Sequence, residues 1–142
     1  MELYKQLSHT TYLCNYHVVF CPKYRYRILR GGVGGKTRDW IRRICEWKGV
    51  EILEGTVSYD HVHLLLSIPP KMAVSEVVGT IKGRVAIRMF KEIPEIRKKF
   101  WGRKFWARGY FVSTVGVDEK TIRKYIREQQ ELEMMQQELD LN

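Results

Sequence analysis

Two histidines separated by one residue, His61 and His63, are the side chains in this sequence best suited to bind a metal ion. They open the segment His61–Ile68, which alternates in the manner of a strand. Residues two apart on a strand share a face and lie roughly 6.6 Å apart along it, so both imidazoles can reach one divalent cation. We expect Val62, Leu64, Leu66 and Ile68 to point to the opposite, covered face. A His-x-His pair alone is also found as solvated surface, and neither a cysteine nor a third histidine nearby completes a zinc-type set.

A tyrosine and a glutamine near the C-terminus form a second pair with chemical potential. Tyr125 and Gln129 are four residues apart, and therefore lie on one face of a helix that we expect over about 118–139, with Asp118 as its N-cap. A glutamine amide oxygen is a suitable ligand for Mg²⁺ or Mn²⁺. A tyrosine hydroxyl beside such a metal is a candidate nucleophile. Without the histidines, an ordinary amphipathic helix with a tyrosine at its edge is the better explanation of this segment.

The remaining pattern predicts the elements that must position these groups. Strands are expected at Leu13–Cys21, Val50–Val57, His61–Ile68 and Arg108–Val115, and helices at Lys36–Lys48 and Val74–Phe90. The order βαββαβ plus a C-terminal helix predicts an α+β, ferredoxin-like domain over residues 1–142. Its antiparallel sheet would have the first and third strands in the middle and both helices on one face. The histidines would then lie on the open face.

The chain resembles the single-tyrosine HUH-type transposases of small bacterial and archaeal insertion sequences, the TnpA type. The resemblance covers nearly the whole chain, in order, and the combination of the histidine pair with the tyrosine helix is specific. The matching segments are Cys14–Phe20, Pro22–Arg25, Asp60–His63, Lys82–Arg84, Phe105–Gly116 and Tyr125–Gln129.

The resemblance implies a role for each residue of the two pairs. It makes His61, His63 and Gln129 the ligands of a divalent metal, Mg²⁺ or Mn²⁺, and Tyr125 the nucleophile. It further implies cleavage of single-stranded DNA with hairpin ends through a 5′-phosphotyrosine link and a free 3′-hydroxyl, with no nucleotide cofactor. A homodimer, in which the tyrosine helix can serve the partner's histidines, and a nucleoid-associated place in the prokaryotic cytoplasm are also expected.

The distribution of charge points to a polyanion as partner. The net charge is +9, and all 25 lysines and arginines lie at or before Arg127, whereas five of the 16 acids follow it. Two basic and aromatic stretches, Lys23–Arg27 and Arg97–Arg108, are expected to contact DNA, with one or two of the four aromatic residues of the second anchored in the core. Lys82, Arg84 and Arg88 are expected to form another basic stripe. The candidate DNA contacts are Lys23, Arg25, Arg27, Lys82, Arg84, Arg103, Lys104 and Arg108.

Four further features complete the expectations from the sequence. Gly31–Thr37 resembles a phosphate-binding loop, but Arg30 stands where that pattern needs glycine, so we expect a flexible turn before the first helix. His17 should lie beside the histidine pair in a hydrogen-bonding role rather than as a metal ligand. The three cysteines are odd in number and lack CxxC spacing, which favours buried thiols in a reducing cytoplasm. No apolar run is long enough to span a bilayer.

Three alternative functions use the same residues differently. An RNA-recognition-type module shares the βαββαβ order but carries stacking aromatic residues on its third strand, where this sequence has none. A domesticated relative of the transposases would bind palindromes without mobilising them. A small metal-dependent hydrolase would use His61 and His63 and leave Tyr125 idle.

Overall fold

The computed structural model describes residues 4–102 and 104–116, together with Lys120, Arg123, Lys124, Arg127, Glu128, Glu131 and Met135. These residues divide into two compact units, Cys14–Val115 and a second one formed by Met1–Leu13 with Gly116–Asn142. The larger unit holds the histidine pair. Tyr125, Gln129, Asp118 and Arg103 lie outside the described residues.

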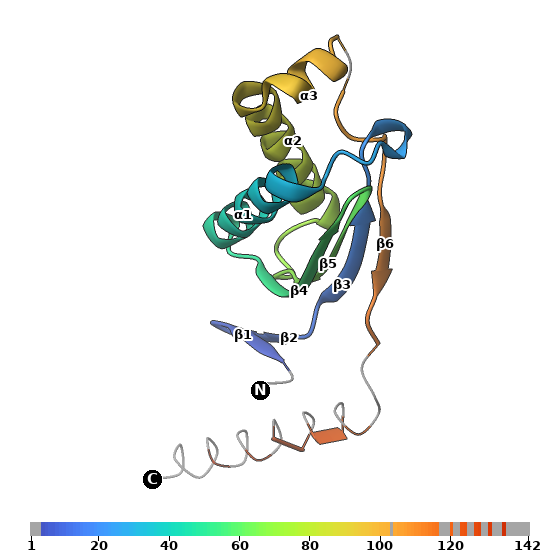
Figure 1. The fold of residues 1–142 in the computed structure, drawn as a ribbon. Coiled ribbons are helices and arrows are strands. Elements are labelled where there is room, and N and C mark those ends of the chain that lie inside the picture. The colour runs from blue at the N-terminus through green and yellow to red at the C-terminus, as the bar shows by residue number, and fades with distance from the viewer. Residues whose placement is uncertain are drawn as a thin grey trace. The chain divides into compact units, whose positions relative to one another are not determined.

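A four-stranded antiparallel sheet forms the larger unit, in the order β4-β5-β3-β6. The strands are β3 (Asn15–Phe20), β4 (Glu51–Ser58), β5 (His61–Ser67) and β6 (Phe111–Thr114). The first and third of them along the chain are central, as predicted. Figure 1 shows α1 (Gly31–Lys48) and α2 (Val74–Glu92) together on one side of the sheet. The ferredoxin-like α+β prediction is therefore confirmed.

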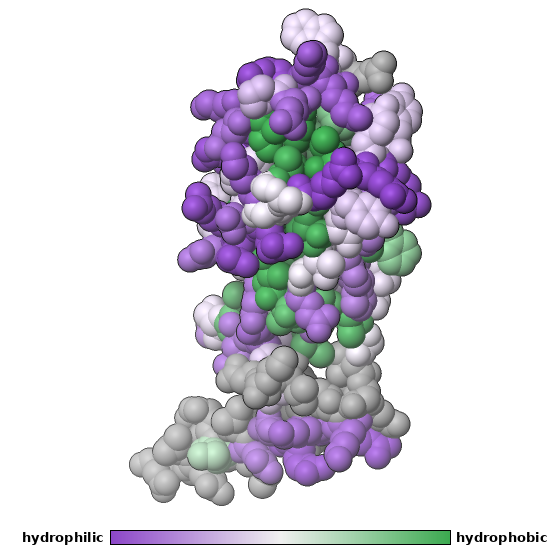
Figure 2. All heavy atoms as spheres, viewed as in Figure 1, coloured by the Kyte–Doolittle hydropathy of each residue, from purple (hydrophilic) through white to green (hydrophobic). Residues whose placement is uncertain are grey.

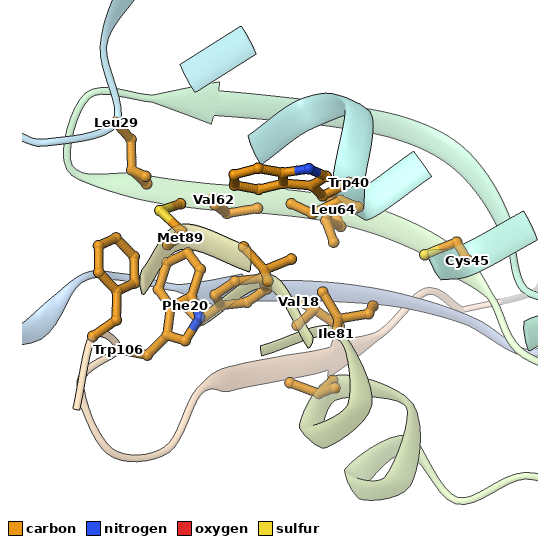
Figure 3. Close-up of a cluster of buried hydrophobic side chains, with 14 of the residues drawn as sticks. Val18, Phe20, Leu29, Trp40, Cys45, Val62, Leu64, Ile81, Met89 and Trp106 are labelled. Atoms are coloured by element: carbon orange, nitrogen blue, oxygen red, sulfur yellow. The ribbon is translucent and has the colours of Figure 1, made fainter. Parts of the chain in front are cut away.

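The core lies between this sheet and its helices. Alternate residues of β5, namely Val62, Leu64 and Leu66, are at most 2% exposed, which confirms the predicted division of that strand into two faces. Figure 3 shows Val62 and Leu64 packed with Val18 and Phe20 of β3 and with side chains from both helices. Burial of this apolar stripe fixes the register, because a slip of one residue would turn it to solvent. The same register turns His61 and His63 away from the core.

The first helix begins five residues earlier than predicted. The glycine-rich segment Gly31–Gly35 forms the first turns of α1, so the expected flexible turn is wrong. Gly34 explains part of the composition, since a Cβ there would come within 2.7 Å of the carbonyl oxygen of Leu29. The hydroxyl of Thr37 is buried and donates to the carbonyl of Val33 at 2.7 Å. Close packing of the Leu29 segment thus outweighs the low helix propensity of glycine.

Two elements were not predicted. The helix α3 (Pro94–Lys99) occupies part of the expected basic loop and buries Ile96. In the smaller unit, β1 (Lys5–Leu7) and β2 (Thr10–Tyr12) form an antiparallel hairpin. The described residues of the C-terminal segment are helical, in agreement with the helix expected there, and Tyr4 donates a hydrogen bond from its hydroxyl to Glu128. Among the described residues, no helix has the length and apolar character needed to cross a membrane.

Candidate functional site

The two histidines lie on the face of β5 that the helices leave open. His61 is half-buried and His63 is exposed, whereas Val62 between them is fully buried. The sheet holds both positions firmly, because β5 pairs with β4 on one side and β3 on the other. The structure therefore places two imidazoles side by side on a rigid, accessible surface.

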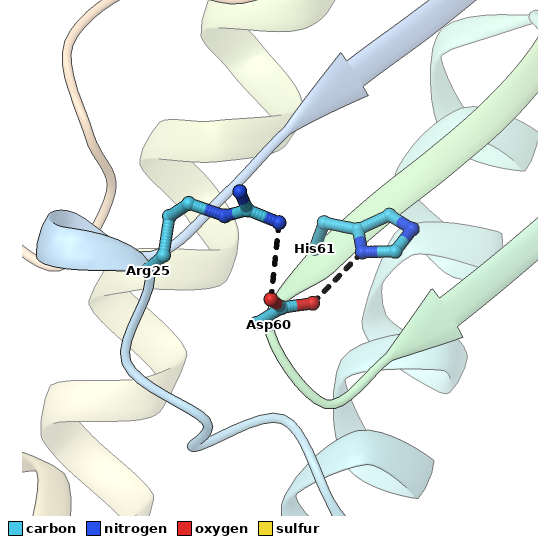
Figure 4. A network of polar contacts seen from close by, with 3 residues as sticks. All are labelled: Arg25, Asp60 and His61. Atoms are coloured by element: carbon cyan, nitrogen blue, oxygen red, sulfur yellow. Dashed lines mark hydrogen bonds and ion pairs between the residues drawn. The ribbon is translucent and has the colours of Figure 1, made fainter.

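Asp60 orients the first of these imidazoles. Its Oδ1 lies 2.9 Å from Nδ1 of His61, and its Oδ2 accepts from Nη2 of Arg25 at 3.2 Å (Figure 4). The bond from His61 holds the pKa of the Asp60 carboxyl below its usual value, against the opposing effect of desolvation and with help from the Arg25 charge. An ionised carboxylate accepts a proton-bearing Nδ1, which leaves Nε2 of His61 as the ring nitrogen with a lone pair.

His17 occupies the neighbouring strand and contacts the second histidine. Its Nδ1 lies 3.1 Å from Nε2 of His63, and the two ring centroids are 5.3 Å apart. The contact is diagonal across β3 and β5, since His17 pairs with Leu65 in the register. This confirms the expected hydrogen-bonding role of His17.

Arg25 belongs to a short turn with unusual backbone geometry. Lys23–Arg25 forms a 3-10 turn in which Tyr24 has φ of 60° and Arg25 has φ of 53°. Two successive non-glycine residues in the left-handed region cost roughly 1–2 kcal/mol each, so tertiary contacts must hold them. One such contact is the Arg25–Asp60 pair, and another is the bond from Lys23 N–H to the Phe105 carbonyl at 2.8 Å.

The three cations that were expected to form one stripe on the second helix have different interaction partners. Nζ of Lys82 donates to the carbonyls of Ala107 at 3.0 Å and Gly109 at 2.7 Å, and burial lowers the pKa of this ammonium. Arg84 lies with its guanidinium 4.3 Å from the ring centroid of the exposed Trp47. Arg88 pairs with Glu92 at 3.3 Å. Lys82 is therefore not part of the expected stripe, whereas Arg84 and Arg88 line one cavity together.

The other candidate DNA contacts are distributed around the Lys23–Arg25 turn and the segment before β6. Arg27 lies 4.8 Å from the ring centroid of Tyr59 through its guanidinium, and Lys104 and Arg108 are exposed. Three of the four aromatic residues expected in that segment, Phe100, Phe105 and Trp106, are buried, one more than predicted, while Trp101 is 82% exposed. Aromatic rings pack edge to face here because their quadrupoles favour it.

A groove of about 1280 Å³ runs beside the C-terminal half of α2. The Lys23–Tyr24 turn and the segment Lys104–Gly109 form its other walls, so it unites the two basic and aromatic stretches that were expected to contact DNA. A smaller cavity of about 490 Å³ lies between α1 and the edge strand β4. Hydrophilic side chains dominate the face of the protein shown in Figure 2, with apolar ones visible between them.

The residues fit a divalent metal only as part of a larger ligand set. Nε2 of His61 is directed away from the Asp60 contact, and a carboxylate behind a metal-binding histidine is a common arrangement. Within the described part of the chain, no group of three or more His, Cys, Asp or Glu side chains could hold a metal ion. A third ligand must then be of another type or come from elsewhere, which is compatible with the glutamine expected at Gln129.

Comparisons with known proteins identify the kind of enzyme. The family model described as "Transposase IS200 like" matches residues 10–129. The transposase of insertion sequence IS200 from Salmonella typhimurium is 41% identical over 137 residues, which cover 96% of this chain and 90% of the relative. A crystal structure assigned as a transposase from Deinococcus radiodurans superposes with a TM-score of 0.72 at 33% identity, over 88% of this chain and 97% of that one.

A REP-associated tyrosine transposase bound to a REP hairpin has the same fold, with a TM-score of 0.56 at 12% identity over 84% of this chain and 68% of the other. The fold and the comparisons together define an enzyme that cleaves DNA and transfers its strands. The chain belongs to the IS200-like transposases, of the TnpA type. The RNA-recognition and simple hydrolase alternatives are thereby set aside.

The sequence did not reveal the residues whose role is to position another side chain of the site. Asp60 directly precedes the histidine pair, and this adjacency was the only available signal for its role. Arg25 was interpreted as a DNA contact, because a cation beside two tyrosines is typical of such surfaces. Its pairing with Asp60, 35 residues away in the sequence, depends on the tertiary structure.

Proposed function

We propose that this transposase nicks and rejoins single-stranded DNA through a covalent tyrosine intermediate, with His61, His63 and Gln129 as ligands of Mg²⁺ or Mn²⁺ and Tyr125 as nucleophile. The observation that carries the proposal is the histidine pair on the open face of β5, with Asp60 fixing the tautomer of His61. A divalent cation bound there would polarise the scissile phosphate.

The chain's own groups account for the exchange of bonds. The hydroxyl oxygen of Tyr125 attacks the phosphorus, the bond from phosphorus to the 3′ oxygen breaks, and the tyrosine remains joined to the 5′ phosphate. The proton lost by the tyrosine balances the proton gained by the departing 3′ oxygen. Because one phosphodiester replaces another, the reverse reaction can join a new 3′ end without nucleotide hydrolysis.

The basic surface supplies the binding of DNA. Neutralisation of phosphates by lysine and arginine releases counterions, so binding should weaken steeply with salt. Hairpin ends are the expected substrate because this family of enzymes acts at the ends of insertion sequences. A domesticated relative that binds such ends without cleaving them would keep the same surface and lose the chemistry.

A cleavage assay on labelled single-stranded DNA from the flanks of the element tests the proposal. The parent protein should form a covalent protein–DNA adduct with Mg²⁺ or Mn²⁺ and none in a chelator. Tyr125→Phe should abolish the adduct and keep hairpin binding, because only the hydroxyl is removed. An adduct that persists in Tyr125→Phe would rule out this nucleophile, and full activity in the chelator would rule out the metal.

We also propose that the enzyme acts as a dimer with composite sites. Strand β6 is an edge of the sheet and exposes Phe111 (61%) and Val112 (41%), and such edges are commonly covered by another chain. If Tyr125 of one subunit serves His63 of the other, a mixture of His63→Ala and Tyr125→Phe proteins should regain some cleavage. Subunit exchange without any regained cleavage would indicate a site contained within each subunit.

A further inference from the structure

The groove beside α2 combines an apolar floor with a cationic rim. Its lining includes the buried rings of Phe105 and Trp106 and the half-buried Ala86 and Phe90, and these four residues are called the floor. Its rim carries Lys23, Lys91, Lys104 and Arg108, and its lining contains no aspartate or glutamate. A fifth cation, Lys82, also lines the groove, but it directs its ammonium to two backbone carbonyls. The charge pattern therefore fits a ligand that is anionic along its edges and apolar in between.

The size of the groove favours a chain segment over a small molecule. Pockets for small ligands have volumes of roughly 300–1,000 Å³, which this open groove of about 1280 Å³ exceeds. A strand of unpaired nucleotides has the required chemistry, since each base offers an apolar face and each phosphate a charge. In a duplex the base faces are stacked on one another and cannot lie on the floor.

Tyr24 provides an aromatic surface at the mouth of this groove. Its ring is 65% exposed, and its backbone is held in the left-handed region. Its ring meets Tyr26 edge to face, with the centroids 5.7 Å apart, and Nζ of Lys23 lies 5.7 Å from its centroid, yet most of the ring stays open to solvent. Stacking of an unpaired base on such a ring is a common source of affinity for single strands.

Gly83 lines the groove and adds no side chain to it. It lies within α2 and lines the groove, and a Cβ built there would meet nothing within 4 Å. Glycine inside a helix destabilises it relative to alanine, so any larger residue would favour the helix and occupy the groove. Gly79, one turn earlier, is equally open but does not line the groove.

We propose that this groove binds an unpaired segment of the DNA strand, with a base on the apolar floor, Tyr24 stacking beside it and phosphates along the cationic rim. The inference deepens the proposed function, on which it rests for the single-stranded nature of the substrate. It assigns a binding site outside the histidine face, and it does not depend on the metal or on Tyr125.

The test compares Gly83→Glu with its matched control Gly79→Glu. Both substitutions add one carboxylate to the same helix at an open position, so the change in net charge is equal. Binding of a fluorescein-labelled oligothymidylate of about 12 nucleotides is measured by anisotropy in a chelator, which prevents cleavage. We expect Gly83→Glu to weaken binding about tenfold or more and Gly79→Glu to weaken it less than about threefold. Equal affinities of the two variants would overturn the proposal.

A second comparison separates bases from phosphates. Tyr24→Ala should weaken binding of the oligothymidylate by about 5- to 100-fold, the usual effect of losing one stacked base, but leave an abasic oligonucleotide of the same length unaffected. An equal loss of affinity for both probes would show a site for the DNA backbone and refute the inference. A larger effect of Gly83→Glu on the binding of a blunt duplex than on that of the single strand would refute it as well. Absence of a tyrosine adduct with this binding intact would instead count against the proposed chemistry alone.

Discussion

Lys82 is expected to stabilise the fold rather than to bind DNA, and Lys82→Met tests this. The ammonium donates to the carbonyls of Ala107 and Gly109, at 3.0 and 2.7 Å, and thereby ties the segment before β6 to α2. Methionine keeps most of the aliphatic stem and removes both bonds. The nearby bond from the Trp106 indole to the Lys82 carbonyl, 2.9 Å long, involves only the backbone of residue 82 and should persist.

The expected loss follows from the environment of each bond. A hydrogen bond from a charged donor contributes about 1.5–3 kcal/mol net. The bond to Gly109 is exposed and the one to Ala107 is partly buried, so water can replace the first more readily. We therefore attribute the loss of stability to the bond with Ala107 alone. The free energy of unfolding should then fall by about 1.5–3 kcal/mol. For a chain of this size the Tm should fall by about 5–12 °C.

Thermal unfolding followed by circular dichroism gives the first measurement, and the salt dependence of oligothymidylate binding gives the second. Lys82→Met should lower Tm and leave the slope of log affinity against log salt unchanged. Lys91→Met, an exposed position on the same helix and on the rim of the groove, should keep Tm and reduce the slope by about 0.7. A Lys82→Met protein with unchanged Tm and a reduced slope would refute the reasoning.

Three further outcomes can be measured on the same protein. In denaturant titrations, Gly34→Ala should lower the free energy of unfolding by about 1–2 kcal/mol, because its Cβ would meet the Leu29 carbonyl. Gly35→Ala should raise it by about 0.5–1 kcal/mol, because a Cβ at that position meets nothing within 4 Å. Burial raises the pKa of the Cys45 thiol to about 11. In the folded protein at pH 8, iodoacetamide should therefore label Cys45 at least about tenfold more slowly than the other two cysteines, and equal rates would contradict this. Asp60→Ala should weaken Mn²⁺ binding, followed by electron paramagnetic resonance, by about 10- to 100-fold, and an unchanged affinity would show that the carboxylate does not orient the metal site.

The sheet could be predicted from the sequence because its burial pattern is local. The alternation in β5 identifies both its covered and its open face, and the closing Pro69-Pro70 marks its end. The central position of this strand follows from general rules for connections between strands and helices. These features alone predict the open face on which the structure has His61 and His63.

The start of α1 could not be predicted because its cause is tertiary. Four glycines in five residues normally indicate a turn, and only the packing of Gly34 against Leu29 explains one of them within a helix. The helix α3 and the hairpin of β1 and β2 are each too short to show a reliable period. Short elements of this kind acquire their conformation mainly from the contacts they make.

The roles of the individual cations could not be predicted either, because they too depend on tertiary contacts. Composition shows that the surface is basic, but each side chain's partner lies far away in the sequence. Arg25 reaches an aspartate in the turn before β5, and Lys82 reaches carbonyls about 25 residues further along. A cation that is already bonded within the protein contributes to the field around it, yet it cannot follow a phosphate as freely as an unpaired one.

The Lys23–Arg25 turn connects the two surfaces that the proposals assign to DNA. Tyr24 lies at the groove and the next residue, Arg25, bonds the carboxylate that orients His61. Both residues hold left-handed backbone angles within one three-residue turn, so we expect a change at one position to affect the other. A strand stacked on Tyr24 would therefore favour the same turn geometry that keeps Arg25 on Asp60. By reciprocity, an occupied metal site should strengthen the binding of the strand in the groove. The change in affinity should not exceed about fivefold, because the coupling depends on the exposed Arg25–Asp60 ion pair.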